Sequence, residues 1–128
     1  MEVLASRLIL HPSDMAQSRH FYEQVLDLRI FHEYGDGSAV VGVVYFLGGG
    51  FLELSGATPA RANGFSTLWL QVPDVSREKT RLRDLGVPLE APASRKPWRL
   101  VELLLADPGG HAVILVEVPE DQFLRRKL

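Results

Sequence analysis

The chain has 128 residues, with 14 basic and 16 acidic side chains, a formal net charge of −2 at pH 7 and no cysteine. This length suits a single domain with a sizeable core, and the lack of cysteine excludes disulfides and thiolate metal sites and favours a reducing compartment. Because the chain has neither a basic stripe nor an apolar run of about 18 residues, we expect a cytoplasmic protein that binds no nucleic acid and no membrane.

The apolar run at residues 3–11 predicts a first strand. Because side chains alternate along a strand, Leu8 and Leu10 point to one face and Arg7 and His11 to the other. We expect the two leucines to face the helix that follows. Arg7 and His11 then face the concave side of the sheet.

Residues 13–28 predict an amphipathic helix. Asp14 can cap its start by accepting a hydrogen bond from an amide one turn in, and Gln17 can complete a capping box. Apolar side chains then recur at three- and four-residue spacing, which gathers them on one face that needs a sheet to cover: Met15, Phe21, Tyr22, Val25 and Leu26.

Three short β-like runs follow the helix, at residues 28–34, 39–47 and 51–55. The glycine triplet at residues 48–50 is a turn between two of them, since a strand follows it, whereas a phosphate-binding loop would need a helix there. Residues 1–56 therefore form a module of one strand, one helix and three strands.

The same order of elements recurs after a linker at residues 57–64, whose proline, glycine and asparagine disfavour a strand. Aligning Asp74 with Asp14 gives an offset of 60 residues, a spacing typical of internal duplication. A second module is expected at residues 65–118, and a C-terminal helix at 119–128. The elements predicted for this module are a strand at 67–72, a helix at 74–85 that ends at Gly86, an edge strand at 88–91, a loop at 91–97, and strands at 98–106 and 111–118.

Several motifs together resemble the vicinal oxygen chelate superfamily, which includes glyoxalase I, bleomycin-resistance proteins and extradiol dioxygenases: H-P-S-D-M-A-Q-S-R-H-F-Y-E-Q-V-L-D-L, F-L-E-L, L-Q-V-P-D-V and A-D-P-G-G-H-A-V-I-L-V-E. The resemblance covers nearly the whole chain and points to a glyoxalase-like member. It implies an α+β fold in which two βαβββ modules form a curled mixed sheet, a partly open barrel, around a cavity. It also implies a single domain over residues 1–128 and a homodimer.

The resemblance further implies where enzymes of this superfamily hold a divalent metal, on the first and last strands of each module. At the four positions where glyoxalase-like members carry their metal ligands, this chain has Arg7, Glu53, Thr67 and Ile114. A catalytic metal takes about three ligands from histidine, aspartate or glutamate, and only Glu53 qualifies. Because Arg7 adds a permanent positive charge, we predict no metal and no cofactor at this position.

Two interpretations of Arg7 and Glu53 remain open. In the first, the two side chains form an ion pair in the cavity, or Arg7 binds an anionic ligand while Glu53 accepts a hydrogen bond from that ligand. In the second, both side chains are partly solvated and only keep the mouth of the barrel polar. Pairing alone does not imply catalysis.

Three other residues are candidates for a site. His11 can act as a general acid or base, although a histidine at a strand end is more often structural. Trp69 alternates with Thr67 and is predicted to face the cavity, where its ring either stacks on a ligand or fills the barrel. Trp98, in a basic loop, either covers an anionic aromatic ligand or lies in solvent. The other three histidines are assigned no role.

Two classes of function follow. The favoured class is a metal-independent module that binds a small organic molecule in a cavity lined by Arg7, Glu53, Thr67, Trp69 and Ile114. The alternative is a glyoxalase-like lyase, isomerase or dioxygenase that uses Glu53 or His11, with or without a metal. The first is favoured because enzymes of this superfamily take their electrophilic power from the metal.

Overall fold

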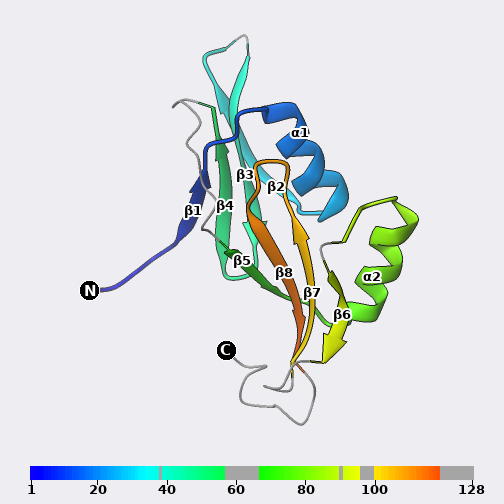
Figure 1. Ribbon diagram of the computed structural model, residues 1–128. Helices are drawn as coiled ribbons and strands as arrows, with labels where there is room; N and C mark the ends of the chain where they lie inside the picture. Colours follow the sequence, from blue (N-terminus) through cyan, green and yellow to red (C-terminus); the bar gives the residue numbers. More distant parts are fainter. Residues whose placement is uncertain (38, 57–66, 90, 96–99, 119–128) are drawn as a thin grey trace. The chain divides into compact units, whose positions relative to one another are not determined.

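The structure is a computed structural model that describes residues 1–37, 39–56, 67–89, 91–95 and 100–118, with residues 91–95 described by their backbone alone. The predicted linker, the predicted C-terminal helix and Trp98 lie outside the described residues. The chain forms two compact units, Met1–Ala62 and Asn63–Leu128, and each is described by itself (Figure 1).

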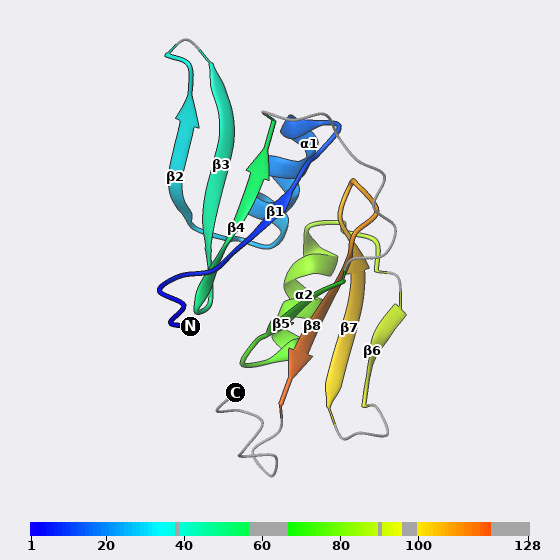
Figure 2. The same ribbon diagram turned by 90° about the vertical axis from the view of Figure 1, so that its left-hand side faces the viewer.

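Unit 1 places one helical segment against a four-stranded mixed sheet (Figures 1 and 2). Its elements are β1 (Arg7–Leu10), α1 (Met15–His20), the π-helical turn η1 (Phe21–Val25), β2 (Ile30–Gly35), β3 (Val40–Leu47) and β4 (Gly50–Ser55). The strand order is β1-β4-β3-β2, in which β1 runs parallel to β4 and the other pairs are antiparallel. This is the predicted order of strand, helix and three strands.

Unit 2 repeats the arrangement. Its elements are β5 (Thr67–Gln71), α2 (Val75–Asp84), β6 (Ala91–Arg95), β7 (Val101–Ala106) and β8 (Ala112–Glu117), with strand order β5-β8-β7-β6 and β5 parallel to β8. The register repeats too, because Ile9 lies opposite Glu53 in unit 1 and Trp69 lies opposite Ile114 in unit 2. The predicted α+β fold of two βαβββ modules is confirmed.

Both helices begin where the sequence predicts. The side chain of Asp14 accepts a hydrogen bond from the backbone N–H of Gln17 at 3.0 Å, and Asp74 accepts one from Arg77 at 3.1 Å. Helix α2 is followed by Gly86 at a φ of +76°, a left-handed conformation that glycine adopts at little cost. No helix among the described residues is long and apolar enough to cross a membrane.

The helical segment of unit 1 buries the apolar face that its spacing predicts. Phe21, Tyr22 and Val25 are buried, whereas Met15 and Leu26 are partly buried. The side of the sheet that faces the helix contributes fully buried side chains from β3 and β4, namely Val43, Tyr45, Leu52 and Leu54. Burial of such side chains is the main favourable term in folding, about 1.5–3 kcal/mol for each large one.

A polar network fixes the helical segment of unit 1 to its sheet. Arg19 donates to Glu23 and to Glu33 of β2, each at 2.6 Å, and the buried hydroxyl of Tyr45 on β3 donates to Glu23 at 2.8 Å. Burial raises the pKa of Glu23, but the hydrogen bonds from Arg19 and Tyr45 outweigh it and hold this pKa below its ordinary value. The carboxylate therefore stays ionised at the join between helix and sheet.

The predicted start of the first strand was wrong. Strand β1 begins at Arg7 rather than at residue 3. Arg7 lies opposite Phe51, and β4 begins only one residue earlier at Gly50, so the residues before Ser6 have no β4 backbone beside them to pair with. Leu8, which was expected to face the helix, is 41% exposed on this short edge strand.

The prediction for residues 91–97 was also wrong. Residues 91–95 form the edge strand β6 rather than a loop, and β6 pairs antiparallel with β7 with a register shift between Ala91 and Ser94. Pro92 falls within that shift. Proline lacks an N–H and is tolerated on an edge strand, where not every amide needs a ladder partner. A segment reading A-P-A-S-R carries no strand signal of its own.

The N-terminal cap of α1 can be tested by substitution. Asp14→Ala removes the acceptor for the Gln17 amide and should lower the free energy of unfolding by about 1 kcal/mol, as measured by urea denaturation. Asp14→Asn keeps a side-chain oxygen and should be nearly neutral. Equal losses in both variants would show that the charge of Asp14, rather than its capping bond, carries the effect.

Candidate functional site

The candidate site is centred on Glu53, which lies on the central strand β4. Its neighbours Leu52 and Leu54 are fully buried in the core. Because side chains alternate along a strand, Glu53 points to the opposite face of the sheet. Glu53 is nevertheless only 7% exposed, so its charge needs partners.

Arg7 on β1 supplies the first partner. Its Nη1 donates to Oε1 of Glu53 at 2.8 Å, so the ion pair that was one of two interpretations of the sequence is present. The side chain of Arg7 is 43% exposed, whereas that of Glu53 is 10% exposed. The ion pair therefore presents its cationic half to solvent and keeps its anionic half inside.

Tyr34 on β2 supplies the second partner, which the sequence analysis missed. Its hydroxyl donates to Oε2 of Glu53 at 2.5 Å. To reach β4, the tyrosine ring crosses β3 at Gly42, where an added Cβ would lie 2.3 Å from Cζ of Tyr34. The glycine in the middle of the V-V-G-V-V run is the signal that could have pointed to this contact, since such a glycine often marks a close approach.

These contacts set the protonation state of the site. Burial raises the pKa of Glu53, but the hydrogen bonds from Tyr34 and Arg7 and the charges of Arg7 and His11 outweigh it, so this pKa lies below its ordinary value. Burial and the bond to Glu53 raise the pKa of Tyr34. At neutral pH the site holds an ionised carboxylate whose two oxygens already accept hydrogen bonds, and a tyrosine that keeps its proton.

His11 lies just beyond β1 and is partly buried. Its charge acts on Glu53, which places it near the ion pair. His111 has a structural role: its backbone N–H donates to Oδ1 of Asp107 at 2.8 Å, and the Asp107 N–H donates to the carbonyl of His111 at 2.9 Å. These two bonds close the turn before β8.

The remaining predicted site residues that the structure describes belong to unit 2. Thr67 and Trp69 alternate along β5 with the less exposed Leu68 and Leu70, and Trp69 is 49% exposed. Ile114 is partly buried and packs against a cluster that includes Val116 and Leu100. A cavity lined jointly by these residues and by Arg7 and Glu53 stays a prediction.

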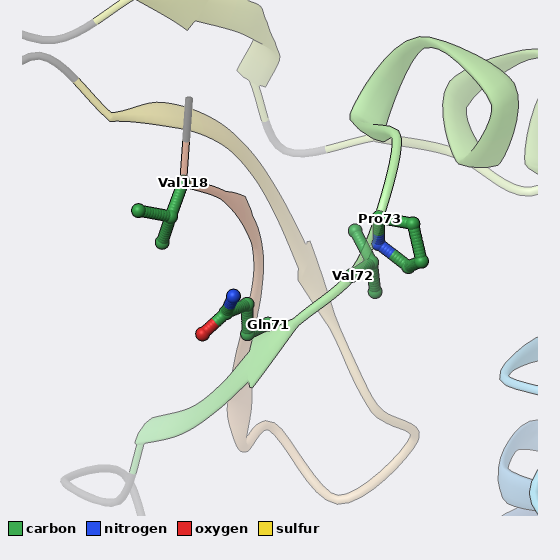
Figure 3. A pocket seen from close by; sticks show the side chains of 4 residues that line it. All are labelled: Gln71, Val72, Pro73 and Val118. Atoms are coloured by element: carbon green, nitrogen blue, oxygen red, sulfur yellow. The ribbon is translucent and has the colours of Figure 1, made fainter. Parts of the chain in front are cut away.

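A separate hollow lies at the end of β5 (Figure 3). It has a volume of about 260 Å³ and is lined by Gln71, Val72, Pro73 and Val118. None of the predicted site residues that the structure describes lines it. Among the four described residues of its lining, Gln71 alone has a polar side chain with hydrogen-bonding groups.

The side chains that the structure describes at these positions do not fit a catalytic divalent metal. Of the four positions at which the resemblance implies ligands, only Glu53 carries a metal-binding group, and both of its oxygens are engaged by Arg7 and Tyr34. Within the described ranges, no group of three or more His, Cys, Asp or Glu side chains is arranged to hold a metal ion. Three or more such ligands are the usual minimum.

The role of Gly42 can be tested by adding a methyl group. Gly42→Ala should push the Tyr34 ring off Glu53 and lower the free energy of unfolding by about 1–3 kcal/mol, because a buried carboxylate oxygen loses its partner. In a Tyr34→Ala background the same change should cost little. Gly49→Ala is the matched control, because an added Cβ there meets nothing within 4 Å. Denaturation of the four variants checks this, and equal losses in both backgrounds would contradict it.

The lowered pKa of Glu53 predicts a pH dependence. A carboxyl whose pKa is lower in the folded than in the unfolded state adds stability above its ordinary value of 4.5, and this contribution is lost as the pH falls through the folded value. The wild type should therefore exceed Glu53→Gln in unfolding free energy by about 1–2 kcal/mol at pH 7, with the difference vanishing in acid. Glu2→Gln, on the exposed N-terminal segment, should show no such trend. A Glu53→Gln difference that is constant with pH would refute the assignment.

Comparison with known proteins places these features in a family. Residues 6–115 match the family model of the Glyoxalase/Bleomycin resistance protein/Dioxygenase superfamily. A search of curated protein sequences found no match.

Solved structures share the fold at low sequence identity. A lactoylglutathione lyase from Agrobacterium tumefaciens has a TM-score of 0.70 and 21% identity, over 91% of this chain and 94% of that one. TioX from Micromonospora sp. ML1 gives 0.73 and 20%, over 88% and 97%. TnmS3, an antibiotic binding protein from Streptomyces sp. CB03234, gives 0.72 and 20%, over 92% and 98%. The family match over residues 6–115 goes beyond this likeness in fold, and the chain belongs to the Glyoxalase/Bleomycin resistance protein/Dioxygenase superfamily.

Proposed function

We propose that this protein binds a small organic molecule without the help of a metal ion, using Arg7 and Glu53 of unit 1. Thr67, Trp69 and Ile114 of unit 2 keep their predicted role as ligand-binding residues. The proposal includes a single domain over residues 1–128, a cytoplasmic location and a homodimer. Trp98, outside the described residues, keeps its proposed place beside the ligand.

One observation carries the proposal. Both carboxylate oxygens of Glu53 accept hydrogen bonds from side chains of this protein, and Arg7 is the more exposed residue of the ion pair. A metal at this carboxylate would compete with the hydrogen bonds from Arg7 and Tyr34 and would be repelled by the positive charge of Arg7. An exposed guanidinium, in contrast, is a ready partner for an anionic or polar group of a ligand. The fold shared with an antibiotic binding protein adds support for binding as the function.

The enzymatic alternative has less support. A general base works best when its pKa lies near the working pH, and the pKa of Glu53 is shifted away from neutrality. His11 remains the stronger candidate for proton transfer, because it lies near Glu53 and an imidazole ring can both accept and donate a proton. Turnover that survives Glu53→Gln and is abolished by His11→Gln would favour this alternative.

A thermal-shift screen tests the proposal. Small metabolites and aromatic antibiotics are added with and without Ni²⁺, Zn²⁺ or Mn²⁺. A ligand at about 100 times its Kd should stabilise the folded state by about 2.7 kcal/mol, or several degrees in Tm, equally with and without metal.

The matched variant for this screen is the double substitution Arg7→Gln with Glu53→Gln, which removes both charges together and so leaves no buried carboxylate unpaired. The shift caused by a ligand should fall by at least half in this variant. A large shift with a metal alone, lost in Glu53→Gln, would contradict metal-independent binding.

A further inference from the structure

Three phenylalanine rings gather on the face of the unit 1 sheet that carries Glu53. Phe31 of β2 lies 4.9 Å from Phe46 of β3 and 4.8 Å from Phe51 of β4, and Phe46 lies 5.8 Å from Phe51, measured between ring centroids. Phe31 is 49% exposed and Phe46 is 48% exposed. Aromatic rings packed on one another yet half exposed form an apolar surface that a ligand can reach.

Arg7 lies at the edge of this surface. Its Cζ is 6.0 Å from the centroid of the Phe51 ring, and Arg7 pairs with Phe51 in the β1–β4 ladder. The same guanidinium holds Glu53, whose side chain is only 10% exposed against 43% for Arg7. The charge that a ligand on the rings would meet is therefore positive.

We propose that unit 1 binds a planar aromatic acid on the surface formed by Phe31, Phe46, Phe51 and Arg7, which we call the aromatic–arginine surface. The ring of the acid packs on Phe31 and Phe46, and its carboxylate pairs with Arg7. This inference rests on the proposed function and names the class of ligand.

Each part of this ligand class follows from one property of the surface. A flat aromatic ring gains stacking or edge contacts with phenylalanine beyond the area that it buries, which an aliphatic ring does not. A carboxylate matches the planar fork of an arginine side chain. A cationic ligand would be repelled by Arg7 and would find Glu53 buried and already engaged.

The choice of ligand is tested with three small probes: 2-naphthoate, the neutral 2-naphthylmethanol and the aliphatic cyclohexanecarboxylate. Titration calorimetry on the full chain should show 2-naphthoate binding at least about tenfold more tightly than either of the others. The alcohol lacks the charge for Arg7, and the aliphatic acid lacks the flat ring. Equal affinity for 2-naphthoate and the alcohol overturns the proposal.

The location is tested with variants. Phe46→Ala should weaken 2-naphthoate binding about tenfold and Phe46→Leu less, because leucine keeps apolar area without a flat face. Arg7→Gln combined with Glu53→Gln should abolish the preference for the acid over the alcohol while leaving no buried charge unpaired. Leu85→Ala, at a half-exposed leucine of unit 2, should change nothing. Unchanged 2-naphthoate affinity in Phe46→Ala overturns the proposal.

The same measurements separate this inference from the proposed function. If another molecule from the thermal-shift screen binds in an Arg7-dependent manner while 2-naphthoate binds no better than the alcohol, only the aromatic acid is wrong. If no molecule depends on Arg7, the proposed function fails as well. In another outcome, Phe46→Ala changes the oligomeric state seen in analytical ultracentrifugation and leaves 2-naphthoate binding unchanged. In that case the rings form a contact between two copies of this chain, and the aromatic-acid site is refuted.

Discussion

The sheet of unit 1 depends on one buried charge, the carboxylate of Glu53. Burying an isolated carboxylate costs several kcal/mol, so its partners must be held in place. Those partners come from the two outer strands of the order β1-β4-β3-β2: Arg7 reaches in from β1, and Tyr34 reaches across β3 from β2. Figure 2 shows these two strands at opposite edges of the sheet. A single carboxylate thus links both edges of the sheet to its centre, and Gly42 leaves the room that this link needs.

The fold is shared with a lactoylglutathione lyase. In the part of this chain that the structure describes, the carboxylate of Glu53 is instead engaged by Arg7 and Tyr34. Equivalent positions of the two units have the same strand register: Ile9 pairs with Glu53 in unit 1, and Trp69 pairs with Ile114 in unit 2. Fold alone therefore leaves the chemistry open, and the residues at those positions decide it. At those positions unit 1 carries an ion pair, and unit 2 carries an aromatic ring opposite an aliphatic side chain.

Much of this fold follows from local signals in the sequence. The caps at Asp14 and Asp74 and the 60-residue offset between them predict both modules, because capping chemistry and alternation act within a few residues. The pairing of Arg7 with Glu53 was one of two interpretations, and it depended on the resemblance to place both residues on neighbouring strands. Local signals do not determine the register between strands that are distant in sequence. They therefore cannot predict a side-chain contact that depends on that register.

Tyr34 and the three phenylalanines show this limit. Strand β2 carries register irregularities between Ile30 and His32 and between Tyr34 and Gly35, and each shift changes which side chains share a face. Simple alternation would put Phe31 and Tyr34 on opposite faces, yet Tyr34 contacts Glu53 and Phe31 contacts Phe51 on the same face. Strand β6 was missed for a related reason, since its pairing with β7 comes from its neighbour rather than from its own residues.

The geometry of the ion pair also bears on what binding would cost. A guanidinium carries five N–H donors, so Arg7 can hold Glu53 through Nη1 and still donate to a ligand from its exposed side. An anionic ligand at Arg7 would then share the guanidinium with Glu53 instead of displacing it. Glu53 would keep its partners and its charge, and the two edges of the sheet would stay joined. A preorganised arginine of this kind loses little rotamer entropy on binding, because the ion pair has already fixed its direction.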